Sequence, residues 1–193
     1  SRLIVEEGIK DSLIEKIVAE SAKYQPDDPL KPETEMGAIV DEKQMKSILG
    51  YIESGHKEGA KLVIGGKRVK AETGGFYVPP TLFDKVDNKM KIAREEIFGP
   101  VLSVIGCKGP EDAIRIANDT SYGLAAGIWT RDITLAHRAA KELRAGFVYI
   151  NTFDQGDMSV PFGGYKQSGF GRDKSLHALD KYCELKSTWV ELS

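Results

Sequence analysis

The chain has 193 residues, of which 41% are hydrophobic and 29% are charged, and its formal net charge at pH 7 is −2. This composition is typical of a soluble globular protein with a core, and the small net charge gives no general attraction to nucleic acid or to an anionic membrane. Because no apolar run approaches ~20 residues and only two cysteines occur, we expect a cytoplasmic protein with reduced cysteines and no membrane-spanning helix.

The beginning of the chain predicts a strand and two helices. Residues 2–5 form a short apolar run typical of a strand. Because the sequence starts on this run without an initiator methionine, we expect a piece of a longer chain. Apolar residues recur at helical spacing over residues 9–22, and three prolines then make residues 25–37 a loop. Asp41 with Gln44 three residues later resembles a capping box, which predicts a second helix with an apolar face formed by Met45, Ile48, Leu49 and Ile52.

Three further strands are expected in the middle of the chain. Residues 60–66 predict a strand ended by glycines. Residues 77–83 predict an extended segment whose prolines suit an edge strand or an irregular one. Residues 101–107 predict a third strand, and Pro110, followed by two acidic residues, predicts the start of a helix.

The second half of the chain alternates strands with helices. Residues 125–130 predict a strand, Asp132 caps a helix that Gly146 stops, and residues 147–151 predict another strand. Such alternation is typical of a parallel sheet. We therefore predict an α/β fold: a three-layer, mostly parallel sheet with helices on both faces, plus a carboxyl-terminal oligomerisation strand at residues 184–192. Sites of open α/β sheets lie at the carboxyl ends of strands, and Asn151 follows such an end.

Two stretches are candidates for binding. In EEIFGP, residues 95–100, an ionised carboxylate with two acceptor oxygens could hold a vicinal diol such as a ribose. The alternative is a solvated turn beside a core phenylalanine. In VPFGGYKQSGFGR, residues 160–172, the glycines allow a loop to approach and close on a ligand. The alternative for this stretch is an irregular crossover between two elements.

The residue types that usually carry out catalysis are sparse. Cys107 ends a strand and Cys183 lies in a short helix, and neither has a histidine near it in the sequence, so we expect buried or incidental thiols. The three histidines are single residues on helices with charged neighbours, and we expect them on the surface: His56, His137 and His177. We expect no metal site, and the sequence contains neither a GxGxxG stretch nor a P-loop.

Four strings in order resemble the aldehyde dehydrogenase superfamily: REEIFGPVLSV, NDTSYGLAAGIWTRD, AGFVYIN and PFGGYKQSGFGRD. The resemblance runs over the whole chain and is closest to the bacterial gamma-glutamyl-gamma-aminobutyraldehyde dehydrogenases. It implies that residues 1–180 correspond to the part of the catalytic domain after the nucleophilic cysteine, and residues 181–193 to the oligomerisation arm. The nucleophilic cysteine and the general-base glutamate of the family would then lie upstream, so none of the residues present is expected to be catalytic.

The resemblance also implies roles for six residues. Glu96 corresponds to a residue that binds the nicotinamide ribose, and Phe98 to one beside the nicotinamide. Phe162 corresponds to a wall of the aldehyde tunnel, and Asn151 to a residue of the substrate-binding site that fixes the loop near the catalytic centre. The loop of residues 152–160 is where the family varies its substrate pocket, and it contains Phe153 and Asp157. Asp157 could meet a cationic group of an amino-aldehyde. The alternative is a solvated loop acid.

The function implied by the resemblance is the oxidation of a small-molecule aldehyde to its carboxylic acid with NAD or NADP, in a homodimer or homotetramer. The substrate would be an amino-aldehyde or a gamma-glutamylamino-aldehyde, and the isolated chain would be inactive. The alternative is a non-catalytic truncated paralogue that acts only in oligomerisation or interaction. A relative that reduces acyl phosphates is a third possibility, but EEIFGP together with PFGGYKQSG fits the aldehyde-oxidising branch better.

Overall fold

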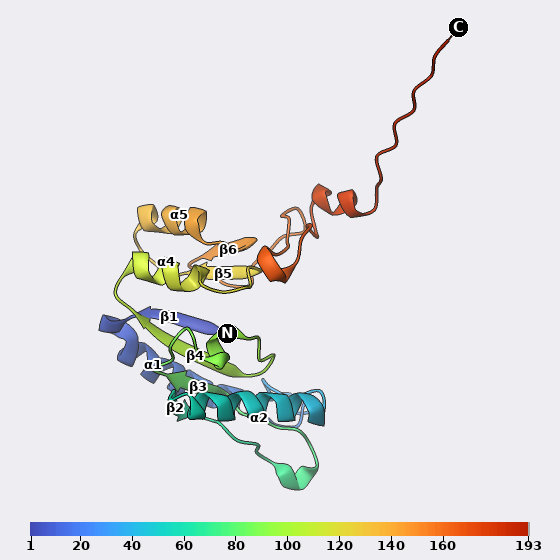
Figure 1. The fold of residues 1–193 in the computed structure, drawn as a ribbon. Helices are drawn as coiled ribbons and strands as arrows, with labels where there is room; N and C mark the ends of the chain where they lie inside the picture. The colour runs from blue at the N-terminus through green and yellow to red at the C-terminus, as the bar shows by residue number, and fades with distance from the viewer. Residues whose placement is uncertain (193) are drawn as a thin grey trace. The chain divides into compact units, whose positions relative to one another are not determined.

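The computed structural model describes residues 1–192, which separate into two compact units, the first up to Asp119 and the second from Thr120 onward. Both combine strands and helices, as predicted (Figure 1). Within residues 1–192, no helix has the length and apolar character needed to cross a membrane. The functional assignment of residues 1–180 and 181–193 remains a prediction.

The first unit contains a four-stranded sheet in the order β1-β4-β3-β2. The central strand β4 (Val101–Cys107) pairs in parallel with both β1 (Arg2–Glu6) and β3 (Thr81–Asp84), and the edge strand β2 (Lys61–Ile64) pairs antiparallel with β3. Of the two alternatives for residues 77–83, an edge strand or an irregular one, the edge position was wrong, because β3 lies between β4 and β2. The prolines precede β3, so they remove no donor from its ladder, and the strand lies inside the sheet.

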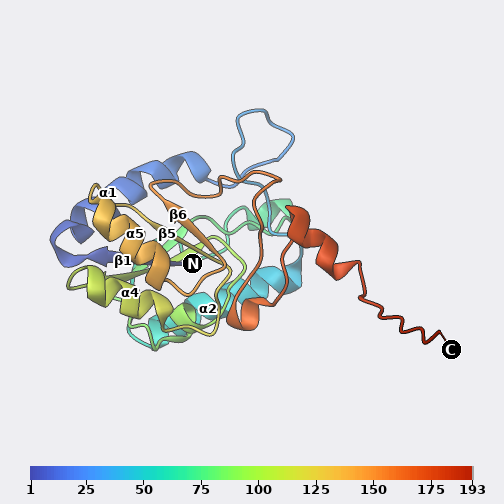
Figure 2. The same ribbon diagram turned by 90° about the horizontal axis from the view of Figure 1, so that it is seen from above.

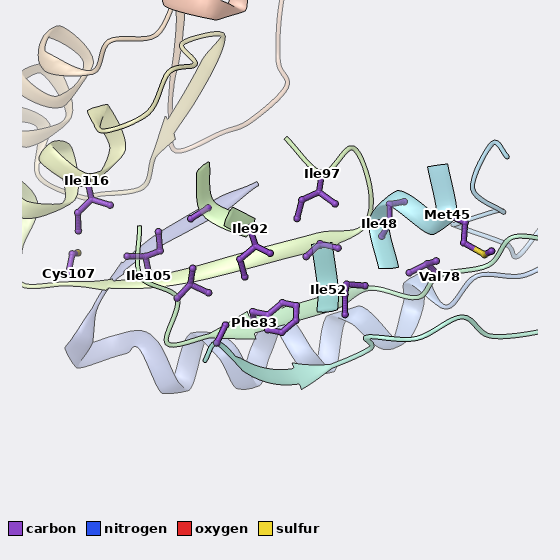
Figure 3. Packing of buried hydrophobic residues seen from close by; sticks show 14 residues of the cluster. Met45, Ile48, Ile52, Val78, Phe83, Ile92, Ile97, Ile105, Cys107 and Ile116 are labelled. Atoms are coloured by element: carbon purple, nitrogen blue, oxygen red, sulfur yellow. The ribbon is translucent and has the colours of Figure 1, made fainter. Parts of the chain in front are cut away.

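Helices cover both faces of this sheet and give the predicted three layers. Leu82 of β3 and Val104 of β4 pack with residues of α1 (Glu7–Ser21), whereas Phe83 and Ile105, the next residues along each strand, pack with α2 (Glu42–Lys57). Successive side chains of a strand point to opposite faces, so α1 and α2 lie on opposite sides. Figure 3 shows the cluster on the α2 side of the sheet, which includes Phe83 of β3 and Ile48 and Ile52 of α2.

The predicted caps are present at the helix starts. The Asp41 carboxylate accepts a hydrogen bond of 2.7 Å from the Gln44 backbone N–H, as expected at the start of α2. The predicted apolar face of α2 is buried at Met45, Ile48 and Ile52. The remaining elements of the first unit are α3 (Lys91–Arg94) and α4 (Pro110–Asn118), together with the short 3-10 helices η1 (Ala22–Tyr24) and η2 (Ala71–Thr73).

The second unit has a two-stranded parallel sheet of β5 (Ala125–Ile128) and β6 (Phe147–Ile150). The crossover helix α5 (Ile133–Glu142), capped by Asp132, lies over one face of this sheet in both ribbon views (Figures 1 and 2). The strand order predicted a continuous sheet through β4, β5 and β6. Instead, β5 and β6 form a separate sheet. The predicted parallel pairing is therefore confirmed, and the predicted continuous sheet is wrong.

Between β6 and residue 192 the chain contains two short 3-10 helices, η3 (Lys166–Ser168) and η4 (Leu176–Lys181), and an isolated antiparallel bridge between Phe162 and Asp173. Residues 184–192 have no regular secondary structure, so the predicted terminal strand is absent from the described chain. A strand requires hydrogen bonds to a neighbouring strand, and residues 184–192 leave η4 without one (Figure 1). Four large apolar side chains are exposed there: Leu185, Trp189, Val190 and Leu192.

Candidate functional site

A turn between α3 and β4 presents the first candidate residues. Ile97 is buried in the core, whereas Phe98 is 78% exposed and has a φ of 55°, which a non-glycine residue adopts only when its surroundings hold it there. Gln44 Nε2 donates to the carbonyl oxygens of Ile97, at 3.1 Å, and Phe98, at 3.0 Å. The amide of α2 therefore fixes a turn that displays an aromatic side chain outward.

The two acidic residues before this turn differ in their contacts. Glu95 Oε2 accepts a 2.8 Å hydrogen bond from the Tyr51 hydroxyl and lies 4.0 Å from Lys91 Nζ. Glu96 is exposed, and no donor within residues 1–192 is hydrogen-bonded to its carboxylate. Glu96 therefore keeps both oxygens for an external pair of donors, and it is the residue that fits a vicinal diol.

An open cavity of about 250 Å³ in the second unit brings other candidate residues together. One wall comes from β6 and the others from residues after it: Phe147, Tyr149, Asp154, Gln155, Gly156, Asp157, Val160, Phe162 and Lys174. Phe162 and Asp157 were predicted from the sequence. Lys174 and Tyr149 were not.

Aromatic rings form the apolar wall of the cavity. Phe147 and Tyr149 are two residues apart on β6, point to the same face, and have ring centroids 4.5 Å apart. The Phe162 ring lies 6.0 Å from Phe147, and the Phe153 ring lies 5.0 Å from Tyr149. Phe153 is therefore behind the lining and also stacks on Trp129.

Charged groups of both signs line the same cavity. Asp157 Oδ1 accepts hydrogen bonds from the Ser159 backbone N–H, at 2.8 Å, and from the Ser159 hydroxyl, at 2.6 Å. These bonds hold the pKa of the Asp157 carboxyl below its ordinary value, and the Lys174 ammonium acts in the same direction. The carboxylate thus remains ionised at neutral pH.

Asn151 ties the end of β6 to the end of β5. Its backbone has a φ of 55°. Its side-chain Oδ1 accepts from the Thr130 N–H at 2.8 Å, and Nδ2 donates to the Thr130 carbonyl at 2.9 Å. Both functions of the amide are used by backbone, so we expect Asn151 to position the following loop and not to contact a ligand.

The glycine-rich stretch packs backbone against backbone. A Cβ at Gly146 would lie 1.8 Å from the Gly163 carbonyl oxygen, and a Cβ at Gly163 would lie 2.5 Å from the Gly171 carbonyl oxygen. Lys166 Nζ donates to the Thr120 carbonyl, and Arg172 Nη1 donates to the Gly164 and Gly171 carbonyls. These two cations hold the loop in place, and the loop presents Phe162 to the cavity.

The histidines are exposed as expected, but Cys183 follows η4 and does not lie in the predicted short helix. Cys107 is buried, and burial raises the pKa of its thiol, which disfavours the reactive thiolate. Cys183 is exposed, as are the three histidines. Across the described residues 1–192, no group of histidine, cysteine, aspartate and glutamate side chains has an arrangement that could hold a metal ion.

Comparison with known proteins identifies relatives over the whole chain. A model of the aldehyde dehydrogenase family matches residues 1–188. The chain is 45% identical over 192 residues to the NADP/NAD-dependent aldehyde dehydrogenase PuuC of Escherichia coli strain K12, with 100% of this chain and 38% of that protein covered. The KauB aldehyde dehydrogenase structure from Pseudomonas aeruginosa is 61% identical with a TM-score of 0.95, covering 100% of this chain and 39% of that one.

A second solved structure bears on the more specific resemblance. The gamma-glutamyl-gamma-aminobutyraldehyde dehydrogenase of Burkholderia cenocepacia J2315 is 61% identical with a TM-score of 0.93, and the match covers 97% of this chain and 38% of that one. The chain thus spans about two fifths of the length of the relatives that it matches.

Proposed function

Because the chain belongs to the aldehyde dehydrogenase family, we propose that it supplies cofactor-facing and aldehyde-facing side chains to an oxidoreductase. The complete protein oxidises an aldehyde to its carboxylic acid with NAD or NADP, in keeping with the dual cofactor use in the name of the Escherichia coli relative. The first unit binds the nicotinamide side of the cofactor, and the second unit binds the aldehyde.

The observation that carries this proposal is the turn at Glu96 and Phe98. A carboxylate with both oxygens open accepts hydrogen bonds from the two hydroxyls of a ribose. Phe98, held outward by the Gln44 amide, offers an aromatic surface for the nicotinamide. The bound nicotinamide supplies the acceptor for the hydride that leaves the substrate. Glu96 and Phe98 orient it, and misorientation is costly because the reacting atoms must stay in close alignment.

The cavity of the second unit provides the aldehyde side. Its aromatic wall, in which Phe162 lies beside Phe147 and Phe153 beside Tyr149, excludes water from an apolar substrate stem. Asp157 attracts a cationic group at the far end of the substrate, and this attraction grows as water is displaced. We therefore favour an amino-aldehyde or a gamma-glutamylamino-aldehyde, the second being the aldehyde in the name of the Burkholderia relative.

No nucleophile is assigned among the described residues. Cys107 lies in β4 with its thiol buried and its pKa raised, and Cys183 lies outside the lining of the cavity. We propose that the partners of the complete protein are the aldehyde, the nicotinamide cofactor and further copies of the same subunit, in a dimer or a tetramer.

The test compares the two adjacent carboxylates in the complete protein. Glu96→Gln removes the charge that holds the ribose, and we expect single-turnover hydride transfer to fall roughly 100-fold, as for a misplaced reactant. The thermal midpoint should change little because Glu96 is exposed and makes no hydrogen bond within residues 1–192.

Glu95→Gln is the matched control. Its amide oxygen can still accept from the Tyr51 hydroxyl, so transfer should stay close to that of the unmodified protein. Cofactor affinity, transfer rate and thermal midpoint are measured for both variants. Normal transfer in Glu96→Gln together with a large loss of stability would assign Glu96 to folding and remove the proposed cofactor role.

A further inference from the structure

Lys174 places a cation in the cavity of the second unit. Its Nζ lies 5.8 Å from the centroid of the Phe162 ring and lines the same space as Asp157. In residues 1–192, no carboxylate oxygen lies within the 4.0 Å of an ion pair with Lys174. The ammonium therefore contacts an aromatic face while its donors remain open toward the cavity.

The backbone around Lys174 is strained. Lys174 has a φ of 59° and Ser175 a φ of 53°, two successive side-chain-bearing residues in the left-handed region. Such conformations are unfavourable for residues that carry a side chain, and they persist only where surrounding contacts enforce them. Strain of this kind concentrates at functional sites and clamps.

Three backbone hydrogen bonds enforce this conformation. The Ser175 N–H donates to the Met158 carbonyl at 2.7 Å, which joins the strained pair to the loop that carries Asp157. On the other side, the N–H groups of Phe162 and Asp173 each donate to the other residue's carbonyl, at 2.8 and 2.6 Å. Lys174 is thus held between the cavity's aromatic wall and its acidic loop.

The charges of Lys174 and Asp157 influence each other without direct contact between the two side chains. Lys174 contributes to lowering the pKa of Asp157, yet the two side chains form no ion pair. Asp157 Oδ1 is occupied by Ser159, whereas no donor within residues 1–192 is hydrogen-bonded to its Oδ2. A ligand that carries an ammonium and a carboxylate on adjacent atoms would satisfy both groups.

We propose that Lys174 determines specificity by binding a carboxylate at the far end of the substrate, while Asp157 binds the ammonium beside it. The preferred aldehydes then end in an α-amino-acid group, and aldehydes with an ammonium alone bind less well. This inference rests on the proposed aldehyde oxidation, because it assigns the cavity to the end of the substrate that lies opposite the aldehyde.

The test uses the complete protein and three related aldehydes. The first is gamma-glutamyl-gamma-aminobutyraldehyde, and the others lack either its carboxylate or its α-ammonium. In Lys174→Met we expect KM for the first aldehyde to rise at least about tenfold, with kcat nearly unchanged. A tenfold loss of affinity corresponds to the loss of one hydrogen bond to a charged group. KM for the analogue without the carboxylate should not change. Lys174→Arg should retain the low KM, and Lys16→Met, at an exposed position of α1, is the matched control.

Two results would overturn the inference while leaving aldehyde oxidation intact: an equal rise of KM for all three aldehydes, or no rise for any. If the protein oxidises no aldehyde, the proposed function fails. The role of Lys174 is then tested separately, by measuring the affinity for a ligand that has no aldehyde group. Calorimetry with the butylamide of the gamma-glutamyl group, which has the amino-acid end and no aldehyde, should show at least about tenfold weaker binding in Lys174→Met. Unchanged affinity would exclude a contact between Lys174 and the carboxylate.

Discussion

At the scale of single residues, the close approach of two glycines shapes the cavity. Gly146 stands immediately before β6, and Gly163 follows Phe162. Their backbones meet so closely that a Cβ at Gly146 would lie 1.8 Å from the Gly163 carbonyl oxygen. The glycines of the loop are therefore required for packing, and Phe162 gains its position in the cavity from them.

This close approach predicts that Gly146→Ala destabilises the protein. The methyl group cannot be accommodated without moving the glycine-rich loop, so we expect the free energy of unfolding to fall by about 3 kcal/mol or more. Gly50→Ala is the control, because no atom lies within 4 Å of a Cβ there. Gly50 is inside α2, and alanine should stabilise that helix by up to about 1 kcal/mol. Denaturant unfolding of both variants is the measurement, and equal stabilities would contradict the packing argument.

Some residues of the candidate site could be predicted from the sequence and others could not. The residue types of EEIFGP and the family resemblance predicted Glu96 and Phe98 as binding residues, and these roles stay predictions. Tyr149 could have been found from its two-residue spacing with Phe147 on a predicted strand. Lys174 could not, because its place beside Phe162 depends on two residues with positive φ that are not glycine.

At the scale of elements, local signals predicted the helices and strands well. Asp41 and Asp132 cap α2 and α5, and the boundaries of β4 agree with the predicted residues 101–107. Pairing between distant segments was harder to predict. Nothing local indicates that β5 starts a new sheet, or that β3 lies inside the first sheet, since both facts depend on long-range hydrogen bonds.

The terminal segment, residues 184–192, supports a prediction about assembly. Its apolar side chains are exposed and its backbone lacks a neighbouring strand in the described chain, so a sheet edge of another subunit would suit it. Deleting residues 184–193 from the complete protein should lower the mass of the particle measured by light scattering. An unchanged mass together with unchanged stability would place this segment within its own subunit.

At the scale of the whole molecule, the chain divides the proposed tasks between its units. The cofactor-facing turn is in the first unit, and the cavity for the aldehyde is in the second. The relatives are more than twice as long as this chain, so the complete reaction is proposed for the complete protein only. The 193 residues contain one buried thiol and one exposed thiol outside the cavity lining, and we propose that neither attacks the aldehyde.

The most direct test of this account is the rate of NADH or NADPH formation with an aldehyde, measured side by side for the complete protein and for a polypeptide of these 193 residues. We predict aldehyde-dependent formation by the complete protein with at least one of the two cofactors, and none by the 193-residue polypeptide. Absence of activity in the complete protein would contradict the proposed oxidation and favour an oligomerisation or interaction module. Turnover by the 193-residue polypeptide that is lost in Cys107→Ser or Cys183→Ser would contradict the conclusion that it lacks a nucleophile.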